Sequence, residues 1–333
     1  MKIALFSSKS YDSEYFAIAN QSFEFEIVHF ETRLRSHTAH LATGMDAVCV
    51  FVNDRVDRET IAILKDLGVG VIALRCSGFN NVDVAAAAEA GLKVVRVPAY
   101  SPTSVAEHAL ALILTLNRKT HKAYNRVRDG NFSLERLTGF NIAGKTVGVI
   151  GTGKIGQAFL RIMMGMGCRV LAYDKFPDES LEKSGIPYVG LEKLLAGSDI
   201  VSLHCPLTPE TAYVINRQTL SMMKPGAMLI NTSRGALINS ADVIESLKQR
   251  QLGYLGIDVY EQEADLFFGD HSEEILQDDD IARLMTFSNV LITAHQAFFT
   301  REALEEIART TLQNLRDFRD IAVLENEVRY LPE

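Results

Sequence analysis

Short runs of β-branched and other apolar residues recur through the first hundred positions and predict buried strands. Between several of them lie stretches with helical character, such as RETIAILKDLG at 58–68 and NVDVAAAAEAG at 81–91. Apolar strands that alternate with helices are typical of a parallel sheet covered on both faces. The predicted strands are KIALFS (2–7), FEIVHF (25–30), AVCVFV (47–52), VIALRC (71–76) and KVVRVP (93–98).

This alternation is interrupted near residue 100. Two prolines flank the sequence AYS at 99–101, and either Ser101 or Ser104 is suited to cap a long helix. The helix is expected to continue through AEHALALILTLNRKTHKAYNRVRDG at 106–130, and a loop at 131–144 follows it. The residues before this interruption are therefore predicted to form one small α/β unit.

Strands and helices alternate again from residue 146 and predict a second, fuller sheet. Helical stretches such as LEKLLAGS (191–198) and ADVIESLKQRQ (241–251) separate six strand candidates, and a further helix is expected at 301–320. The predicted fold class is therefore α/β, with two doubly wound parallel sheets. The six candidates are TVGVIG (146–151), RVLAYD (169–174), IVSLHC (200–205), AMLINT (227–232), LGYLGIDVY (252–260) and VLITAH (290–295).

Composition narrows the class of protein. The 333 residues are 47% hydrophobic and 23% charged, which is ordinary for a globular protein, and the length allows two domains. A formal net charge of −8 disfavours nucleic acid and anionic membranes as partners, whereas a local Arg or helix N-terminus can still bind a small anion. No apolar run approaches membrane-spanning length and the N-terminus lacks a signal-peptide pattern, so we expect a soluble, cytoplasmic protein.

The cysteines form no CxxC pair and lie inside apolar runs. This pattern indicates reduced, packed thiols, and neither a disulfide framework nor a metal site is expected. The four are Cys49, Cys76, Cys168 and Cys205.

The strongest local signal is TVGVIGTGKIG at 146–156, where a strand ends directly in G-x-G-x-x-G and a helical run follows. Glycines at this spacing permit a tight turn, close backbone approach to a pyrophosphate, and close packing of helix on strand. The pyrophosphate is expected at the N-terminus of the helix, where free N–H groups favour negative charge. The residues of this motif predicted to form the cofactor-binding site are Gly151, Gly153, Lys154, Ile155 and Gly156.

An acidic residue supports this interpretation and bears on the choice of cofactor. Asp174 ends the next predicted strand, 18 residues beyond Gly156, near the spacing at which an acid binds the adenosine ribose hydroxyls. Its carboxylate would repel a 2′-phosphate, and its neighbour is Lys175 rather than an Arg. The sequence therefore predicts NAD in preference to NADP.

Further candidates lie at the ends of three strands of the second sheet, at the edge where open α/β sheets bind ligands. Arg234 comes just past one strand, Asp258 lies at the end of the next with Glu263 five residues later, and His295 lies at the end of the last. Singly, such residues are more often surface ion pairs, solvated acids or structural histidines. Together they suit reduction of a 2-keto acid: the Arg binds the carboxylate and polarises the carbonyl, and the His protonates the alkoxide beside an orienting acid. Hydride would come from the nicotinamide.

With these residues in place, the chain resembles the D-isomer-specific 2-hydroxyacid dehydrogenases from end to end. It is most similar to their bacterial fermentative D-lactate dehydrogenases, which share the FNNVD stretch, the VPAYSP turn and an acidic segment after the catalytic Glu, here at 263–274. The motifs occur in the family's order: ALRCSGFNNVD (73–83), VPAYSPTSVAEHA (97–109), GVIGTGKIG (148–156), SLHCPLT (202–208), INTSRGALI (230–238), GIDVYEQE (256–263) and TAHQAF (293–298).

The resemblance implies an organisation that periodicity alone does not predict. A flavodoxin-like substrate domain would be discontinuous, formed by 1–100 plus 299–333, and a Rossmann NAD-binding domain would occupy 101–298. A cleft between them would close over the substrate. A homodimer or homotetramer is also implied, with the helix from Val105 packing across a dimer axis.

The resemblance also implies residue roles. Arg234 would bind the substrate's carboxylate and carbonyl, His295 would be the acid/base, and Glu263, rather than Glu261, would be its partner. Asp258 would lie beside the nicotinamide. The remaining implied contacts are Cys205, Pro206, Thr232 and Ser233 along the cofactor, backbone N–H groups at Ser77 and Gly78 on the substrate carboxylate, and Tyr100 and Phe298 as pocket walls.

Reduction of pyruvate to D-lactate is the favoured activity, because Phe79, Tyr100 and Phe298 suggest a small apolar pocket for a methyl group. Reduction of glyoxylate, hydroxypyruvate or a broader set of 2-keto acids stays open as an alternative activity, because apolar pockets discriminate weakly between substrates. Phosphoglycerate dehydrogenases are another branch of the family, and short versions of them exist. Formate dehydrogenases differ by having Gln at the position of Glu263. The alternative from another class is a non-enzymatic, NAD-sensing protein like the family's transcriptional co-repressors, which have long disordered tails.

Overall fold

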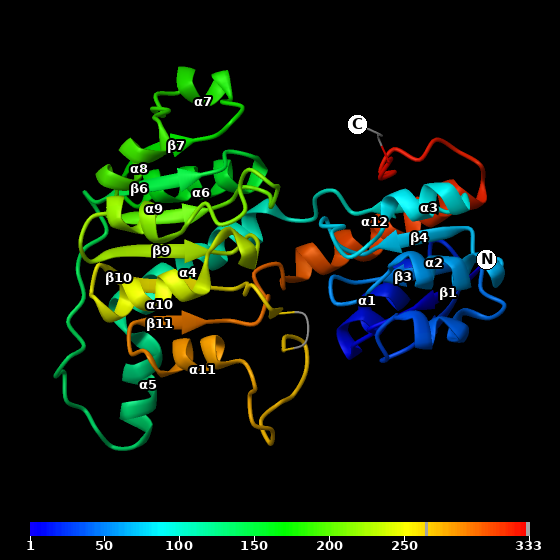
Figure 1. Ribbon diagram of the computed structural model, residues 1–333, viewed down its shortest axis with the longest axis horizontal. Helices are drawn as coiled ribbons and strands as arrows, with labels where there is room; N and C mark the ends of the chain where they lie inside the picture. The colour runs from blue at the N-terminus through cyan, green and yellow to red at the C-terminus, as the bar shows by residue number, and fades with distance from the viewer. Residues whose placement is uncertain (264–265, 331–333) are drawn as a thin grey trace. The chain divides into compact units, whose positions relative to one another are not determined.

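The computed structural model describes residues 1–263 and 266–330. The chain divides into two compact units, the first made of Met1–Ser101 with Phe299–Glu333 and the second of Pro102–Phe298 (Figure 1). Each unit contains a parallel β-sheet covered by helices, as the alternating pattern predicted. Within the acidic segment at 263–274, residues 264 and 265 lie outside the described part.

The first unit is built on a five-stranded parallel sheet. Its elements are β1 (Lys2–Leu5), α1 (Ser10–Asn20), β2 (Glu26–His29), the 3₁₀ helix η1 (Ser36–Ala42), β3 (Ala47–Val50), α2 (Arg58–Asp66), β4 (Val71–Leu74), α3 (Val84–Ala90), β5 (Lys93–Arg96) and α12 (Arg301–Arg319). The strand order is β2-β1-β3-β4-β5, which is the flavodoxin-like order. Because parallel crossovers are right-handed, α1 covers one face, where α12 joins it, and η1, α2 and α3 cover the other.

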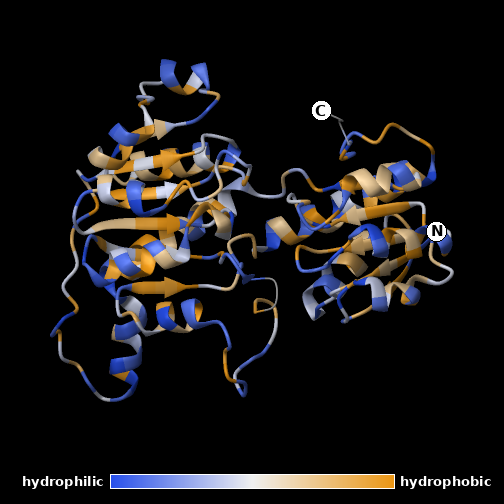
Figure 2. Cartoon of the chain, viewed as in Figure 1, coloured by the Kyte–Doolittle hydropathy of each residue, from blue (hydrophilic) through white to orange (hydrophobic). Residues whose placement is uncertain are grey.

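The core of the first unit joins segments from both ends of the chain. Side chains of alternate strand residues, such as Leu5 and Cys49, point to one face of the sheet and are buried there. Ala308, Leu312 and Leu315 form a stripe along α12 at helical spacing and pack into the same core. Figure 2 shows apolar strands in the middle of the unit with more polar residues outside. The C-terminal helix is thus an integral part of the N-terminal unit.

The second unit is built on a six-stranded parallel sheet. Its elements are α4 (Pro102–Arg118), α5 (Thr120–Arg128), β6 (Thr146–Ile150), α6 (Lys154–Gly165), β7 (Arg169–Tyr173), α7 (Glu179–Lys183), α8 (Leu191–Gly197), β8 (Ile200–Leu203), α9 (Arg217–Met222), β9 (Ala227–Asn231), η2 (Gly235–Leu237), α10 (Ser240–Lys248), β10 (Leu252–Ile257), α11 (Asp279–Thr286) and β11 (Val290–Ile292).

The strand order of this sheet is β11-β10-β9-β8-β6-β7. A single parallel bridge between Ala172 and Tyr188 adds a remnant of a further strand beyond β7. With that remnant counted as the third strand, the order is 3-2-1-4-5-6-7, which is the 3-2-1-4-5-6 order of dinucleotide-binding sheets with β11 added as a seventh strand. The chain therefore changes its direction of travel between β6 and β8, which is where such sheets bind their ligand.

The two faces of this sheet pack against different helices. α4 and α6 pack together on one face, where Val147, Val149 and Ile230 are buried. α8, α9, α10 and α11 cover the other face, where Leu203 and Leu229 are buried. Strands covered on both sides must be apolar at nearly every position, which is why they appear in the sequence as continuous apolar runs.

The predicted single helix across 106–130 is wrong. α4 begins at Pro102, ends at Arg118, and is separated from α5 by Lys119, whose φ of 51° lies in the left-handed region. The buried Asn117 side chain hydrogen-bonds both the backbone N–H and the C=O of Phe140, at 2.8 and 2.7 Å. The returning loop thereby fixes the end of α4, an interaction that helical periodicity does not predict.

All four cysteines are buried and unpaired, as their apolar surroundings predicted. Within the described part of the chain, no helix combines the length and the apolar character needed to span a membrane.

Candidate active site

The predicted glycine motif lies between β6 and α6, at the point where the second sheet changes direction. Gly151 has a φ of 95°, which L side chains rarely adopt. A Cβ at Gly151 would lie 2.4 Å from the backbone N of Cys205 at the end of β8, and a Cβ at Gly156 would lie 2.0 Å from the carbonyl oxygen of Gly151. Both positions therefore require glycine for steric reasons, independently of any ligand.

The start of α6 fits the pyrophosphate of a dinucleotide. Gly153 is the N-cap and supplies no side-chain hydrogen bond, so the first N–H groups of the helix, from Lys154 and Ile155 onward, have no cap. A Cβ at Gly153 would meet no other atom, so the space before this helix end is open. At the end of β9, the buried Thr232 Oγ1 has no hydrogen-bond partner within the described part of the chain. These unsatisfied groups suit an anionic ligand with further polar groups.

Asp174 lies directly beside this loop, after β7. Its Oδ2 accepts a 2.6 Å hydrogen bond from the Thr152 backbone N–H and a second from Thr152 Oγ1, and its Oδ1 accepts one from the Phe176 N–H. The Tyr188 hydroxyl donates to Thr152 Oγ1 and so helps to fix the Thr152 side chain that holds the Asp174 carboxylate. The carboxylate is thereby held at the loop in the place expected of the ribose-binding acid.

The ends of β8 and β9 are tied together at the same edge of the sheet. Ser233 Oγ donates a 2.6 Å hydrogen bond to the carbonyl oxygen of Cys205, next to Pro206. Burial raises the pKa of the Cys205 thiol to about 11, so this side chain is protonated at neutral pH. Cys205 is therefore suited to lining a site, and not to acting as a nucleophile.

His295 and Glu263 form a hydrogen-bonded pair at the carboxyl-end edge of the second sheet. His295 Nδ1 lies 2.8 Å from Glu263 Oε1, and both side chains retain some exposure, at 15% and 21%. The second carboxylate oxygen of Glu263 accepts a 2.8 Å hydrogen bond from the Tyr260 backbone N–H, which fixes its orientation. With Nδ1 facing the carboxylate, Nε2 is the ring nitrogen left to meet a substrate.

Glu261 has a different set of partners. Its Oε1 accepts a hydrogen bond from the Tyr213 hydroxyl at 2.5 Å, and its Oε2 accepts one from Ser240 Oγ at 2.9 Å. The two acids of YEQE, Glu261 and Glu263, thus have different hydrogen-bond partners, and only the Glu263 carboxylate is hydrogen-bonded to His295 in the described part of the chain.

The backbone at His295 is held in an unusual conformation. Its φ of 51° places a non-glycine residue in the left-handed region, which costs on the order of 1 kcal/mol. The turn is held by Asp258: the His295 N–H donates to the Asp258 carbonyl at 2.7 Å, and the N–H groups of Gln296 and Ala297 donate to its carboxylate at 2.9 and 2.8 Å. Strained backbone held this firmly is common at functional sites.

The Asp258 side chain is fully buried, and the structure uses its carboxylate to hold this turn. Thr293 Oγ1 donates a 2.5 Å hydrogen bond to it, and His108 Nε2 from α4 lies 3.4 Å away. Burial by itself would raise the pKa of Asp258, but hydrogen bonds from His108 and Thr293 and from the backbone outweigh it and keep that pKa below its ordinary value. The predicted place of Asp258 beside the nicotinamide stays a prediction.

We expect Asp258→Asn to lower the free energy of unfolding by about 2–4 kcal/mol at neutral pH, because buried donors lose a charged acceptor. A carboxyl whose folded pKa is lowered stabilises the protein above its unfolded pKa of about 3.9 and loses this contribution as the pH falls through the folded value. Chemical denaturation from pH 7 to pH 3 should therefore show the wild type and the variant converging below about pH 4. A stability difference that does not change with pH would contradict this role of the charge.

Three residues near His295 were not identified from the sequence. His108 and Thr293 hydrogen-bond each other at 3.0 Å beside Asp258, and the Phe268 ring lies 5.8 Å from the His295 ring between centroids. Thr293 lies in the TAHQAF motif two residues before His295, but no local pattern could have identified the other two, because His108 comes from α4 and Phe268 from an irregular segment. Burial lowers the pKa of another histidine, His204, to about 3, so that its ring is neutral and unsuited to protonating a substrate.

Arg234 follows β9 and is the N-cap residue of the short helix η2. Its backbone is braced from within the turn, since Asn231 Nδ2 donates to the Arg234 carbonyl at 2.8 Å. The guanidinium donates to the Ser233 carbonyl at 2.7 Å, and no ion pair of Arg234 is present in the described part of the chain. A Cβ at Gly235 would lie 2.1 Å from the backbone of Tyr260, so this turn packs directly against the segment that leads to Glu263.

The remaining predicted substrate contacts are divided between the units. Ser77 and Gly78 follow β4 in the first unit, where the Ser77 carbonyl accepts a 2.8 Å hydrogen bond from Arg96 and the Gly78 carbonyl lies 3.3 Å from Cys76 Sγ. Tyr100 is partly buried at the end of the same segment. Phe298 is buried in the second unit. Their predicted contact with substrate stays a prediction.

Comparison with known proteins places this arrangement among NAD-dependent oxidoreductases. Residues 110–297 match the NAD-binding domain of the D-isomer specific 2-hydroxyacid dehydrogenases. The chain is 54% identical over 328 residues to D-lactate dehydrogenase of Escherichia coli strain K12, covering 98% of this chain and 100% of that protein. The pyruvate reductase of Chlamydomonas reinhardtii has a similar structure, with a TM-score of 0.93, 48% identity and 98% of each chain covered. D-lactate dehydrogenase from Lactobacillus jensenii, solved with NAD+, has a TM-score of 0.83 at 30% identity, covering 99% of this chain and 100% of that chain.

Proposed function

This chain belongs to the D-isomer-specific 2-hydroxyacid dehydrogenases, and on that premise we propose that it reduces pyruvate to D-lactate with NADH. The family identifies an enzyme that uses NAD as its cofactor. Pyruvate as substrate, the D configuration of the product and the residue roles below are the proposal. The observation that supports it most is the His295–Glu263 pair on a turn braced by Asp258, at the same sheet edge as the glycine loop.

In this proposal the chain's own residues bind the keto acid and deliver the proton. Bound NADH supplies the hydride to the carbonyl carbon. Arg234 binds the substrate carboxylate through its two-pronged donor geometry and polarises the adjacent carbonyl. His295 Nε2 protonates the oxygen as negative charge develops on it, and Glu263 keeps the ring oriented and stabilises the imidazolium.

The other predicted contacts complete the site. Gly151, Gly153 and the first turn of α6 would hold the pyrophosphate, Asp174 the ribose, and Cys205, Pro206, Thr232, Ser233 and Asp258 would lie along the cofactor. Backbone groups at Ser77 and Gly78 would bind the substrate carboxylate, with Tyr100 and Phe298 as apolar walls.

We also propose that the enzyme works as a homodimer or homotetramer in the cytoplasm. Tyr124, Val127, Phe132 and Leu134 on α5 and the loop after it are 62%, 52%, 75% and 82% exposed, and such a group of exposed apolar side chains suits burial against another subunit. A monomer in sedimentation equilibrium at micromolar concentration would contradict this assembly.

The proposed substrate is tested by the loss of NADH absorbance with pyruvate, glyoxylate, hydroxypyruvate and 2-oxobutyrate in parallel. We expect the highest kcat/KM with pyruvate and product that an L-lactate-specific enzyme does not oxidise. Since one methylene is worth only about 1–3 kcal/mol in an apolar pocket, measurable turnover of 2-oxobutyrate is expected too. Fastest turnover of hydroxypyruvate or glyoxylate would contradict the lactate assignment, and no turnover of any of the four would contradict the proposed reaction as a whole.

A further inference from the structure

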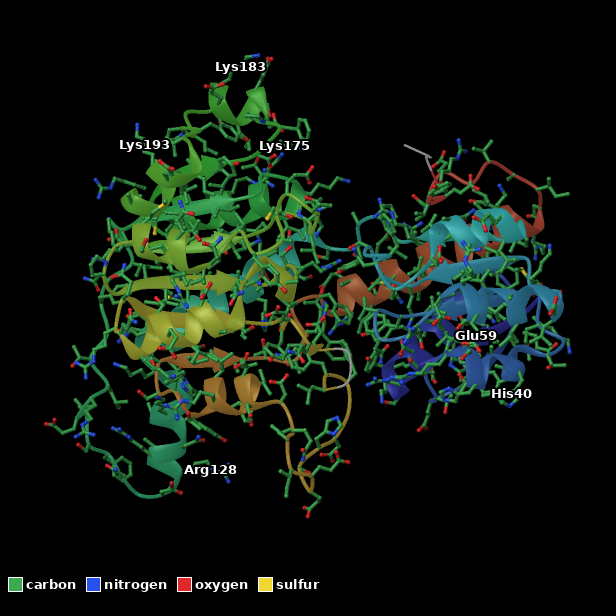
Figure 3. The ribbon with its side chains drawn as sticks, in the orientation of Figure 1. His40, Glu59, Arg128, Lys175, Lys183 and Lys193 are labelled. Carbon is green, nitrogen blue, oxygen red and sulfur yellow. The ribbon has the colours of Figure 1, made fainter. Side chains whose placement is uncertain are left out.

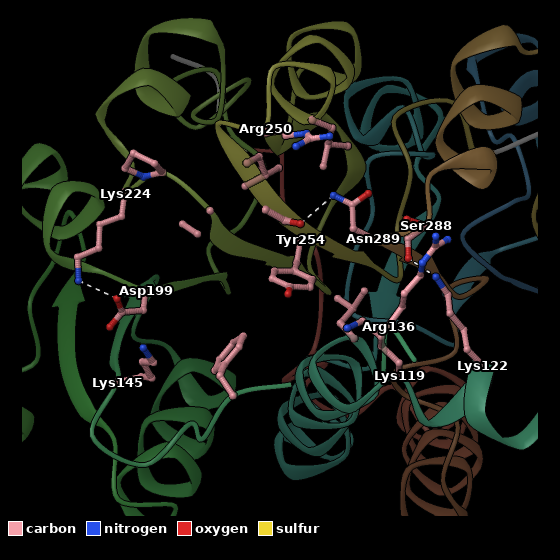
Figure 4. A pocket seen from close by; sticks show the side chains of 18 of the residues that line it. Lys119, Lys122, Arg136, Lys145, Asp199, Lys224, Arg250, Tyr254, Ser288 and Asn289 are labelled. Carbon is pink, nitrogen blue, oxygen red and sulfur yellow. Dashed lines mark hydrogen bonds and ion pairs between the residues drawn. The ribbon is translucent and has the colours of Figure 1, made fainter. Parts of the chain in front are cut away.

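The two ends of the second sheet have different surroundings. Figure 4 shows the pocket at the amino ends of the strands, where Lys145 precedes β6 and Asn289 precedes β11. Its lining includes Lys122 and Arg126 of α5, the helix with apolar side chains proposed for subunit contact, so this region is part of that proposed contact. The hydrogen bonds around Asp258 lie at the other, carboxyl ends of the strands, and a side chain from α4 joins them there.

That side chain, His108, is a polar residue on the buried side of α4. Val105 and Leu112 are buried along this helix, and His108 lies between them at helical spacing on the same side. Its side chain is 17% exposed, and Nε2 lies 3.0 Å from Thr293 Oγ1 and 3.4 Å from Asp258 Oδ1. A largely buried polar ring needs such partners, and these two stand at the ends of β11 and β10.

The hydrogen on His108 Nε2 is fixed by its two neighbours. A threonine hydroxyl has one hydrogen, and Thr293 Oγ1 donates it to Asp258 Oδ1 at 2.5 Å. Towards His108 the same oxygen can therefore only accept, and the ionised carboxylate of Asp258 is an acceptor as well. Nε2 is thus the donor whatever the protonation of Nδ1, and the imidazole faces Asp258 with a hydrogen.

The Asp258 carboxylate depends on such donors because its side chain is fully buried. Burial raises the pKa of Asp258, and the hydrogen bond from His108 is first among the influences that lower it, followed by that from Thr293. A buried carboxylate keeps its charge only where donors or positive charge match it. His108 is the basic side chain that the described part of the chain places beside this carboxylate.

The charged carboxylate in turn supports the turn at His295. Its two oxygens accept the N–H groups of Gln296 and Ala297 at 2.9 and 2.8 Å, and the Asp258 carbonyl accepts that of His295 at 2.7 Å. The φ of 51° at His295 persists only while its surroundings enforce it. A displaced carboxylate would let the turn relax and would move the His295 ring. His108 is therefore connected to this ring through one hydroxyl, one carboxylate and the backbone of the turn.

We propose that His108 is a positioning residue, which holds the Asp258 carboxylate through Thr293 and so keeps His295 in place for proton transfer. This role rests on the proposed function, because it takes His295 as the proton donor. Loss of His108 should slow the chemical step and leave the binding of keto acid and NADH almost unchanged, since neither depends on this turn. Misplacement of a reacting group by about 1 Å can lower a rate on the order of 10²-fold.

The test compares His108→Leu with His108→Gln in the full-length enzyme. Leucine has no donor, whereas the Gln amide can donate from nearly the position of Nε2. Stopped-flow oxidation of bound NADH in a single turnover, with the keto acid that the wild type reduces fastest, measures the chemical step without product release. We expect His108→Leu to be about 10- to 100-fold slower, and His108→Gln to stay within about threefold of the wild type. The half-saturating keto acid concentration and the Kd of NADH should stay within about threefold in both variants.

Thr293→Val removes the hydroxyl between His108 and Asp258, and it replaces His108→Leu if thermal unfolding shows that His108→Leu does not fold. It should be slowed to a similar degree, and the double variant should lose little more than either single one, because both act on the same carboxylate. The matched control is His40→Leu, the same substitution at an exposed histidine of the first unit, labelled in Figure 3. Its rate should stay within about twofold of the wild type.

A second measurement does not depend on turnover. Hydrogen–deuterium exchange of the amides at 295–297 should be faster in His108→Leu than in the wild type, and close to the wild type in His108→Gln, because Asp258 holds these N–H groups. A wild type that reduces none of the keto acids would contradict the proposed function, and the exchange rates would still decide the role of His108.

Four outcomes would overturn the proposal. They are a His108→Leu rate within about threefold of the wild type, a His108→Gln variant as slow as His108→Leu, additive losses in the double variant, and unchanged amide exchange in His108→Leu.

Discussion

His295→Asn is expected to lower kcat for pyruvate reduction by about 10³-fold, while NADH binding and the thermal unfolding temperature stay close to those of the wild type. Asn is chosen because it tolerates the left-handed conformation that His295 adopts, with a φ of 51°. The backbone hydrogen bond from residue 295 to Asp258 is then retained, and the change removes chiefly the proton donor. Steady-state kinetics and fluorescence titration with NADH separate the two effects.

Glu263→Gln is the companion variant for this prediction. Gln can still hydrogen-bond His295 Nδ1, which lies 2.8 Å from Oε1 in the wild type, but it cannot stabilise a positively charged ring. Its loss in kcat should be smaller than that of His295→Asn, and the double variant should lose little more than His295→Asn alone, since the two residues act as a unit. A His295→Asn enzyme that keeps more than about a tenth of its kcat would show that the proton comes from elsewhere.

Arg234→Gln is expected to raise the KM for pyruvate and to lower kcat as well, so that kcat/KM falls by about 10²- to 10³-fold. The reason is that a Gln side chain can neither pair with the substrate carboxylate nor polarise its carbonyl through a charge. Arg234→Lys should recover part of the KM but little of the kcat, because an ammonium lacks the two-pronged geometry. Initial rates over a range of pyruvate concentrations measure both parameters.

The Kd of NADH is the internal control for Arg234. The backbone around it is braced by Asn231 and packed against Tyr260, neither of which the substitution removes. NADH affinity within about threefold of the wild type is therefore expected. An unchanged KM for pyruvate in Arg234→Gln would rule out this residue as the carboxylate binder.

Much of the fold could be predicted from the sequence because the relevant signals are local. All eleven predicted strands are present in the structure. Strands buried on both faces must be apolar along their length, and such apolar runs can be recognised in the sequence itself. The signal for the glycine loop between β6 and α6 is also local. The tight turn, the close approach of the backbone to a pyrophosphate and the packing of helix on strand each require a glycine, and all three glycines fall within six residues.

The features that could not be predicted from the sequence were those that depend on contacts with residues far away in the chain. The helix predicted across 106–130 breaks at Lys119 because the loop at 138–140 returns to bind Asn117. His108 and Phe268 were not identified as neighbours of the turn at His295 for the same reason. Helical periodicity and spacing describe what a segment prefers by itself, whereas these features depend on what packs against it.

For this protein the sequence by itself determined two doubly wound sheets, the glycine loop, and which residue types stand at the strand ends. Only the tertiary structure decided which of them meet: that Glu263, and not Glu261, hydrogen-bonds His295, and that the Asp258 carboxylate braces the turn at His295. The physical reason is that the direction of a side chain depends on backbone dihedrals and on neighbours far away in the chain. Apolar periodicity follows from burial alone, but a 2.8 Å contact between a ring nitrogen and a carboxylate requires every element beneath it to be in place.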